Sequence, residues 1–430
     1  MFRFISKIIG SNVLLKVSSY NAVGIGVRMV AGLVSSKLVA FYLGAPGMAL
    51  LGELRNFLSS VHSLSVLGIQ NGVIKYVSEF KENRPELKKV LSTAGLMVLT
   101  VTVLLSCTIY FGAGYWNRVV FGESQQYLFA IRLIGLMTPF YSMFMFGSHC
   151  INGFAKYKLH INIGIATNVV SLLATIILII NLRVDGAMMA LILGGVFNLL
   201  FILIVFFAKR TKITQWVSLK SFDVGYVKKF LSYTGMTFFS AIATPWIYIG
   251  IRQRIIDVEG LQNAGLWDGM VRISDYYMMF ATTLMTLYVL PKLSEIKTDA
   301  RFKQEIFNFY RTILPIFVAG AVFIFVIKGF IIRMIFTQEF LAMKPLFFWQ
   351  LLGDVFRLAS VVIAYQFVAK NMFWYFVVTN VISLATIYLT SSFFIGKYGF
   401  VGASMGHFIS YMTYFFVLLS IFRKPLLGMR

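Results

Sequence analysis

The sequence predicts an all-α polytopic membrane protein, with twelve transmembrane helices in two six-helix lobes related by a parallel repeat. The first observation is the composition: of 430 residues, 59% are hydrophobic and only 13% are charged, and the mean hydropathy is +0.81. Soluble domains carry about 25% charged residues. The second observation is a series of long apolar segments, and the third is an internal repeat of about half the chain length.

Twelve apolar segments are each long enough to cross a bilayer as a helix, which needs about 20 mainly apolar residues. The connectors between them are short, and the longest, 208–229, is basic. No connector is large enough for a catalytic domain outside the membrane. The segments cover residues 18–42, 49–79, 89–112, 125–154, 160–182, 187–207, 230–256, 266–293, 307–330, 343–369, 373–394 and 402–422.

The connectors alternate in charge along the chain. One set is rich in lysine and arginine, whereas the other holds only Arg118, Arg183, Arg333 and Lys397. Cytoplasmic loops collect Lys and Arg, so we expect both termini in the cytoplasm. This orientation accounts for most of the net charge of +23, and we therefore expect no nucleic acid as a partner.

The two halves of the chain repeat each other. Ser78–Lys81 returns as Ser294–Lys297, and Gly44 returns as Gly260, just before the second and the eighth segment. Each half holds an even number of segments, so both have the same orientation, which is a common plan in transporters. We expect an N-terminal lobe of residues 1–207, a basic cytoplasmic linker of 208–229 and a C-terminal lobe of 230–430.

The segment 266–293 carries charges in its first turns. Asp268, Arg272 and Asp275 fall at i, i+4 and i+7, so they share one helical face. Charges inside hydrocarbon are expensive and normally face a bundle interior or a water-filled cavity. A helix with one wet face is typical of proteins that move polar cargo, although the three residues could instead neutralise one another within the scaffold.

Other segments also contain ionisable side chains. Several of these lie near segment ends, where they can reach the headgroups, but others cannot do so easily. Four basic side chains should lie at similar depth towards the outer leaflet and line one cationic chamber: Lys37, Arg55, Arg252 and Arg272. Three more lie near mid-membrane, where we expect Arg28 to extend the chamber and Asp354 with Arg357 to form a second polar cluster. The histidines of the segments are interpreted as core or interface residues.

The sequence contains no Walker A, CxxC or HExxH motif and no glycine-rich phosphate loop. The two cysteines lie in apolar runs without metal or disulfide spacing. We therefore expect no cofactor, no metal site, no ATP-driven pump on this chain and no catalytic residues.

Four stretches carry a family resemblance: KLVAFYLGAPGMALLGELRNFLS (37–59), NGVIKYVSEF (71–80), LWDGMVRISDYYMMFATTLMTLYVLPKLSEI (266–296) and LFFWQLLGDVFRLASVVIAYQFVAK (346–370). They resemble the polysaccharide-lipid flippases of the MOP (MATE-like) superfamily, with lipid III flippases and Wzx-type O-antigen flippases the most similar. Ten positions match the pattern of these flippases: Lys37, Arg55, Asn71, Lys75, Arg252, Trp267, Asp275, Trp349, Gln350 and Asp354. Asp268 and Arg272 depart from it.

The resemblance implies two lobes around a hydrated, cationic cavity in the bacterial inner membrane. It implies that an undecaprenyl-pyrophosphate-linked oligosaccharide, as in O-antigen and lipopolysaccharide biosynthesis, moves from the cytoplasmic to the periplasmic leaflet by alternating access. Arginine binds phosphate bidentately and lysine binds it as a point charge, which suits such a cavity. Trp267 and Trp349 are candidates for stacking on sugar rings, with Asn71 and Gln350 as supporting polar groups.

Three other functions compete with this interpretation. A MATE-type cation or drug antiporter shares the fold but should have an acidic cavity, and a lipid II flippase belongs to the same superfamily. A polymerase or glycosyltransferase of the same pathway would need a larger loop. Glu53, Asp275 and Asp354 are candidates for coupling transport to a proton or a sodium ion. Partners would be the lipid-linked glycan, membrane lipids, and the polymerase and chain-length regulator of the pathway.

Overall fold

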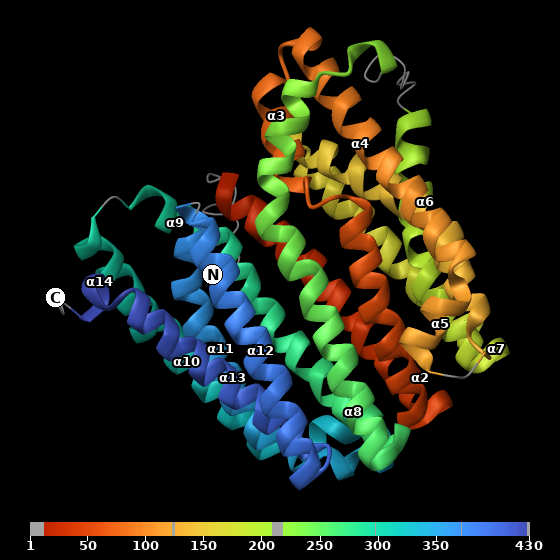
Figure 1. The fold of residues 1–430 in the computed structure, drawn as a ribbon, viewed down its shortest axis with the longest axis vertical. Helices are drawn as coiled ribbons and strands as arrows, with labels where there is room; N and C mark the ends of the chain where they lie inside the picture. The colour runs from red at the N-terminus through yellow and green to blue at the C-terminus, as the bar shows by residue number, and fades with distance from the viewer. Residues whose placement is uncertain (1–12, 123–124, 209–217, 297, 371, 428–430) are drawn as a thin grey trace, which may run out of the picture. The chain divides into compact units, whose positions relative to one another are not determined.

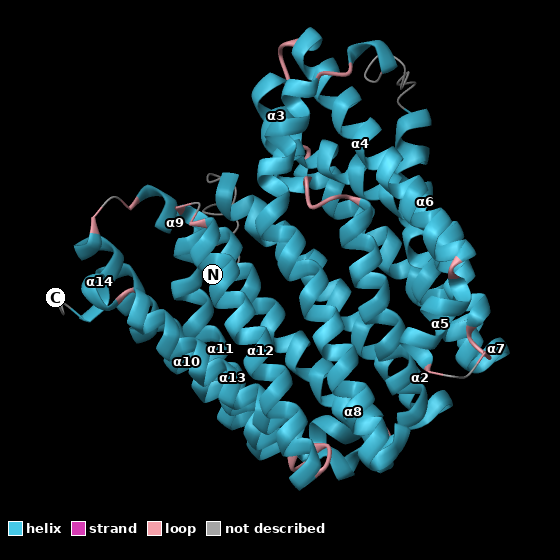
Figure 2. Cartoon of the chain, in the orientation of Figure 1, coloured by secondary structure: helices cyan, strands magenta, loops and turns pink. Residues whose placement is uncertain are grey.

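The computed structural model describes residues 13–122, 125–208, 218–296, 298–370 and 372–427, and the regular elements in these ranges are all helical (Figures 1 and 2). The predicted all-α class is therefore confirmed. The α-helices are α2 (Val13–Ser65), α3 (Gln70–Phe80), α4 (Arg84–Phe111), α5 (Ala113–Phe121), α6 (Leu128–Gly153), α7 (Tyr157–Ala208), α8 (Val224–Leu284), α9 (Leu290–Glu295), α10 (Asp299–Ile335), α11 (Leu346–Ala369), α12 (Phe373–Tyr398), α13 (Val401–Ile421) and α14 (Arg423–Leu427). Shorter turns are the 3-10 turns η2 (Leu219–Ser221) and η4 (Gln338–Met343), and the π-turn η3 (Met285–Val289).

Three of these helices are much longer than a bilayer is thick, and each contains one residue with non-helical backbone angles. These residues are Gly44 in α2 (φ 66°), Arg183 in α7 (φ 52°) and Gly260 in α8 (φ 86°). A positive φ breaks the helical ladder, and glycine adopts it without steric cost. Each kink falls in a connector that the sequence predicts, and the two glycines are the pair that the repeat makes equivalent.

Eight helices in the described part of the chain are long and apolar enough to cross a membrane, by length and composition. The chain is thus a multi-pass membrane protein in its architecture. Helix α8 is outside this set. The count of twelve spans stays a prediction.

The chain divides into two compact units. Unit 1 contains Met1–Tyr42 and Leu54–Ile242, and unit 2 contains Leu43–Glu53 and Ala243–Arg430. The division is not between consecutive halves, because eleven residues from the middle of α2 belong with the C-terminal helices. The expected lobes of 1–207 and 230–430, with their linker, stay a proposal.

In unit 1, α4 packs against α6, and α6 packs against α7. Helix α4 begins where Asn83 caps it, with its side-chain oxygen accepting the Glu86 N–H at 3.3 Å. The later part of the predicted basic linker docks on this helix. The N–H of Ser218 donates to Ser92 Oγ at 2.9 Å. Residues 209–217, the middle of that linker, lie outside the described residues.

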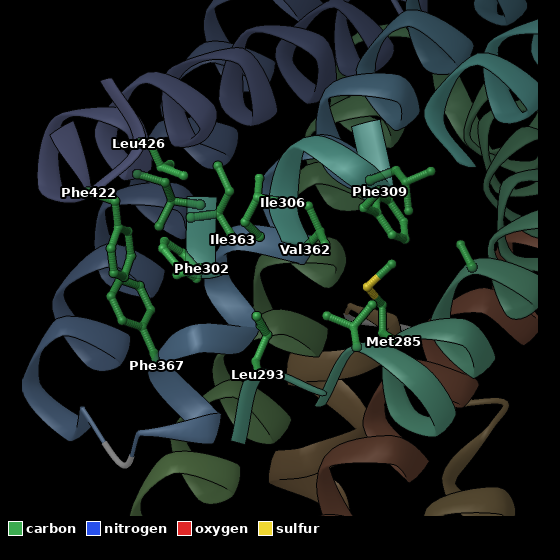
Figure 3. Close-up of a cluster of buried hydrophobic side chains, with 14 of the residues drawn as sticks. Met285, Leu293, Phe302, Ile306, Phe309, Val362, Ile363, Phe367, Phe422 and Leu426 are labelled. Atoms are coloured by element: carbon green, nitrogen blue, oxygen red, sulfur yellow. The ribbon is translucent and has the colours of Figure 1, made fainter. Parts of the chain in front are cut away.

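Unit 2 is built on α11, which contacts α10, α12 and α13, while α12 and α13 pack along each other. A cluster of buried apolar side chains joins α8, η3, α9, α10, α11, α13 and α14 (Figure 3). Met285 and Ile363 are fully buried in this cluster, and Phe302 and Phe422 lie at the opposite end from Met285 (Figure 3). These contacts hold α11 in place, and α11 carries the buried acid Asp354.

Candidate functional site

A buried ion cluster in unit 2 joins α2 to both sides of the Gly260 kink of α8. Arg252 Nη2 donates to Asp268 Oδ1 at 2.6 Å, and Arg252 Nη1 lies 3.4 Å from Glu53 Oε2. Gln253 Nε2 donates to Glu53 Oε1 at 3.4 Å. Arg252 and Glu53 are each 1% exposed and Asp268 is 2% exposed. The charge of Arg252 is therefore paired with two carboxylates of the protein itself.

Two glycines allow the backbones to come close enough for this cluster. A Cβ on Gly52 would lie 2.5 Å from Asp268 Oδ1 and 2.7 Å from Arg252 Nη2. A Cβ on Gly265 would overlap the carbonyl group of Ala45. Any side chain at either position would push α2 away from α8, so glycine is required for the close approach.

Arg272 lies beside this cluster and is less buried. Its Nε is 3.9 Å from Asp268 Oδ2, and its side chain is 12% exposed. Asp268 thus forms its closer ion pair with Arg252 and a longer one with Arg272. Asp275, on the same predicted face, is exposed. Of the three predicted charges, the structure brings Asp268 and Arg272 together.

Trp267 is buried, at 3% exposure, and contacts the same cluster. The guanidinium carbon of Arg252 lies 5.5 Å from its ring centroid, and Tyr248 stacks on it with centroids 5.8 Å apart. A cation over an indole face is attracted by the ring quadrupole. Trp349 is half-buried and lies near Phe348 and Phe408. Sugar stacking on either ring stays a prediction.

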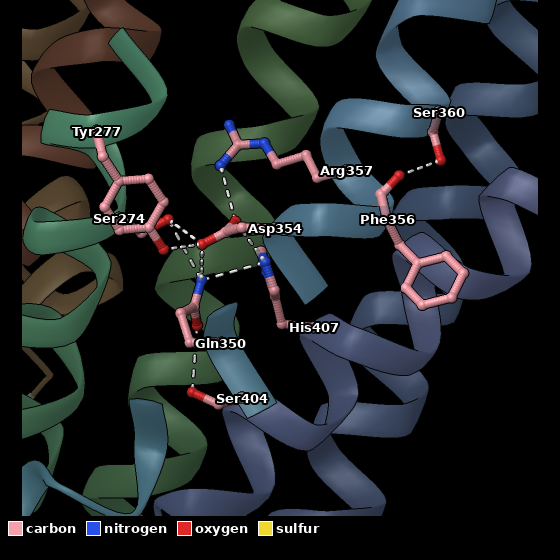
Figure 4. A network of polar contacts seen from close by, with 9 residues as sticks. All are labelled: Ser274, Tyr277, Gln350, Asp354, Phe356, Arg357, Ser360, Ser404 and His407. Atoms are coloured by element: carbon pink, nitrogen blue, oxygen red, sulfur yellow. Dashed lines mark hydrogen bonds and ion pairs between the residues drawn. The ribbon is translucent and has the colours of Figure 1, made fainter. Parts of the chain in front are cut away.

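A second polar network in unit 2 centres on Asp354 of α11, which is fully buried (Figure 4). Oδ2 accepts hydrogen bonds from Ser274 Oγ at 2.6 Å, from Tyr277 OH and from Gln350 Nε2 at 3.5 Å. Oδ1 lies 3.0 Å from His407 Nε2 and 3.8 Å from Arg357 Nη1. Several donors thus converge on one carboxylate.

The network extends to α13 through Gln350 (Figure 4). Gln350 Nε2 lies 3.1 Å from His407 Nε2, and Gln350 Oε1 accepts from Ser404 Oγ at 3.2 Å. Gln350 is 2% exposed, whereas the Arg357 side chain is 25% exposed and lies over the Tyr411 ring. The expected polar cluster of Asp354 and Arg357 is thus part of a larger network that ties α8, α11 and α13 together.

Sequence reasoning missed several members of this network. Ser274 and Tyr277 are three residues apart and both face Asp354, and His407 was interpreted only as a core residue. The i, i+4, i+7 spacing of Gln350, Asp354 and Arg357 was the available signal, because it places all three on one helical face. No group of three His, Cys, Asp or Glu side chains in the described residues is placed to hold a metal ion.

The remaining predicted residues lie in unit 1. Arg55 is half-buried on α2 and lines a cavity of about 290 Å³ between α2, α3, α6 and α7. Lys37 is half-buried, whereas Arg28 and Lys75 are exposed. The side chain of Asn71 lies outside the described residues. The expected chamber draws Lys37 and Arg55 from unit 1 and Arg252 and Arg272 from unit 2, and it stays a proposal.

The apolar helices pack into bundles and enclose clusters of paired charges. This is the architecture of a multi-pass membrane protein of the transporter class. The same fold occurs in a multidrug resistance MATE family transporter of the MOP superfamily in an inward-facing conformation, with a TM-score of 0.75 and 14% identity over 93% of this chain and 95% of that chain. An outward-facing MATE structure of that superfamily gives a TM-score of 0.64 at 13% identity, over 94% of this chain and 96% of that chain.

The sequence comparisons are more specific. A family model described as polysaccharide biosynthesis protein matches residues 54–345, and the chain belongs to this family. The chain is also 26% identical over 414 residues to proteins named lipid III flippase from Escherichia coli strain K12 and from Shigella flexneri, over 95% of this chain and 98% of each relative. These comparisons confirm the resemblance to MOP-type flippases and the prediction of a transporter and not an enzyme.

Proposed function

We propose that the protein is a flippase that moves an undecaprenyl-pyrophosphate-linked oligosaccharide, an O-antigen or related repeat unit, from the cytoplasmic to the periplasmic leaflet. The movement would proceed by alternating access in the bacterial inner membrane, with both termini in the cytoplasm. The observation that carries this proposal is the end-to-end match to lipid III flippases, over 95% of this chain and 98% of the relative.

The distribution of charge supports an anionic substrate. Basic side chains outnumber acidic ones inside the apolar segments. A lipid diphosphate is a concentrated anion on an apolar tail, and arginine binds phosphate through two parallel hydrogen bonds. We assign substrate contact first to the basic residues that keep some exposure: Arg28, Lys37, Arg55, Arg272 and Arg357. Arg252 would act with them by fixing Asp268 and, through it, Arg272.

The alternative with structural support is a cation or drug antiporter, because the fold is that of multidrug MATE transporters. A cationic drug needs an accessible acid. In unit 2, however, Glu53, Asp268 and Asp354 are each at most 2% exposed and lie beside arginine, which leaves Asp275 as the exposed acid among the predicted site residues. A lipid II flippase is the second alternative and differs only in the glycan.

Coupling to a proton or a sodium ion would involve the acids of the two clusters in unit 2. Glu53 and Asp354 are buried next to basic partners, so a change in their charge would alter the pairing of Arg252 or Arg357. Asp275 is the exposed member of this set. The polymerase and the chain-length regulator of the same pathway are the protein partners that such a flippase would serve.

Lipid analysis of cells that lack the protein tests the proposal. A flippase defect should abolish the surface polysaccharide while an intact lipid-linked oligosaccharide accumulates on the cytoplasmic side, and its chemical analysis identifies the glycan. A cell that never makes the precursor would instead point to an enzyme of the pathway. Unchanged polysaccharide with increased sensitivity to cationic drugs would support the antiporter.

A further inference from the structure

Unit 1 contains an open polar pocket between its helices, which we call the α2–α6 pocket. Its α2 face carries Arg55, Ser59, His62 and Ser63 at i, i+4, i+7 and i+8, so the four residues lie along one side of the helix. Gln70 of α3 and Tyr141 of α6 complete its polar lining. All of these residues belong to unit 1, so the pocket is complete within one compact body.

Several polar groups of the α2–α6 pocket are available to a ligand. Within the described residues, the Tyr141 hydroxyl, the Gln70 side-chain amide and the His62 ring nitrogens make no hydrogen bond. Ser63 Oγ donates to the Ser59 carbonyl oxygen at 2.8 Å and still offers its lone pairs. Hydroxyl, amide and imidazole groups can donate or accept hydrogen bonds, so this lining suits a polar ligand.

The pocket is also held in a fixed shape. The His62 and Tyr141 rings stack with centroids 3.3 Å apart and an interplanar angle of 8°. A Cβ on Gly195 of α7 would lie 2.8 Å from Tyr141 Cδ2, so the α7 backbone also packs on this ring. The tyrosine ring is thus immobilised by protein contacts, and it offers the ligand its hydroxyl rather than an open face.

The size of the pocket limits what it can hold. A volume of about 290 Å³ lies at the lower end of ligand sites, which span about 300–1,000 Å³. This volume suits a single sugar ring, and because the pocket is open, the rest of a glycan would extend out of it. The hydroxyls and the amide are neutral donors and acceptors suited to sugar hydroxyls, whereas Arg55 is the group suited to an oxyanion.

We propose that the α2–α6 pocket binds one pyranose ring of the lipid-linked glycan together with an oxyanion attached to that ring. Arg55 holds the oxyanion, and Gln70 and Tyr141 hold ring hydroxyls. The oxyanion has two chemical sources, the carboxylate of an acidic sugar or the phosphate at the reducing end. The origin of the sugar rests on the proposed flippase function, whereas the binding chemistry of the pocket does not.

Binding to the full-length protein in nanodiscs tests the pocket by saturation-transfer NMR with three soluble probes. These probes are methyl β-D-glucuronide, glucose 1-phosphate and the neutral methyl β-D-glucoside. We expect at least one anionic probe to bind about tenfold or more tightly than the neutral glucoside, and Arg55→Ala to remove that preference. Preference for the glucuronide assigns the pocket to an acidic sugar, and preference for glucose 1-phosphate assigns it to the diphosphate end.

Variants of the neutral groups separate a sugar site from a plain anion site. Tyr141→Phe and Gln70→Leu should each weaken the preferred anionic sugar by about three- to tenfold, because each removes one neutral hydrogen bond, and should leave inorganic phosphate unchanged. Tyr110→Phe, which removes an exposed hydroxyl from α4 of the same unit, is the matched control. Gly195→Ala should act like Tyr141→Phe by displacing the ring.

Three results would overturn the proposal: equal binding of the neutral and anionic probes, binding of none of them, or normal affinity in both Tyr141→Phe and Gln70→Leu. Failure of the flippase function appears elsewhere, as a lack of lipid-linked oligosaccharide in cells without the protein. Probes that bind the α2–α6 pocket in that case would leave the pocket standing and the flippase refuted. The reverse pattern would leave the flippase standing with its sugar bound at another site.

Discussion

Replacing Arg252 with methionine should lower the melting temperature of unit 2. Arg252 is 1% exposed, and its guanidinium lies 2.6 Å from Asp268 and 3.4 Å from Glu53. Methionine fills a similar volume but carries no charge. Both carboxylates would stay buried, Glu53 without the Arg252 charge and Asp268 with only Arg272 at 3.9 Å, and an uncompensated buried charge is the costly result of breaking such a pair.

The magnitude follows from this geometry. Removing one partner of a buried pair costs about 3–5 kcal/mol. In a body of about 200 residues each kcal/mol lowers the melting temperature by about 2–4 °C, so we expect a loss of at least about 6 °C. The triple variant Arg252→Met, Glu53→Gln, Asp268→Asn removes the orphaned charges as well and should recover most of the loss.

Thermal melts of the detergent-solubilised protein measure this effect. Arg254→Met is the matched control, because Arg254 is exposed two residues further along the same helix. Equal melting temperatures for Arg252→Met, Arg254→Met and the unchanged protein would refute the reasoning. Normal abundance and stability with complete loss of surface polysaccharide would show instead that Arg252 contacts the substrate directly.

Three further predictions concern other parts of the chain. Arg55→Ala should weaken substrate binding by about 1.5–3 kcal/mol and reduce surface polysaccharide at normal protein abundance, with lysine rescuing partly and glutamate worse than alanine; full transport by the glutamate variant would contradict this. Asp354→Asn should destabilise unit 2 by about 1–3 kcal/mol, because one amide oxygen cannot accept every donor now aimed at two carboxylate oxygens, and His407→Ala should lower the melting temperature in the same direction. In a cysteine-free background, Gln125→Cys and Lys220→Cys should label from opposite sides of the membrane, and labelling from one side would exclude the proposed topology.

The sequence predicts the helical elements well because their causes are local. Hydropathy over about 20 residues defines a span, and a glycine between two spans supplies the backbone angles of a kink. Gly44 and Gly260 were recognisable for this reason, and both have positive φ. Arg183 has no such signature, because its positive φ follows from the tight connection between the two halves of α7.

The partners of the buried charges could not be predicted in the same way. The i, i+4 rule pairs Asp268 with Arg272 at 3.9 Å, yet Arg252 lies closer, at 2.6 Å. Glu53 reaches Arg252 across about two hundred residues of sequence. Helical spacing gives the face of each helix but does not specify which helix packs there. For the same reason the sequence does not predict that His407 contacts Asp354, because this contact depends on how α13 packs against α11.

Helix α10 is long enough to contact both lipid and water. Its 37 residues extend about 55 Å, whereas a hydrocarbon core is about 30 Å thick. Its first turns alternate charged residues with the buried Phe302 and Ile306, so we expect this end of the apolar cluster to lie in the interfacial, water-containing layer. Water drives burial there, while packing alone stabilises contacts in lipid. Urea should therefore loosen the Phe302 end of the cluster first, while bilayer thickness should act on the central turns of the helix.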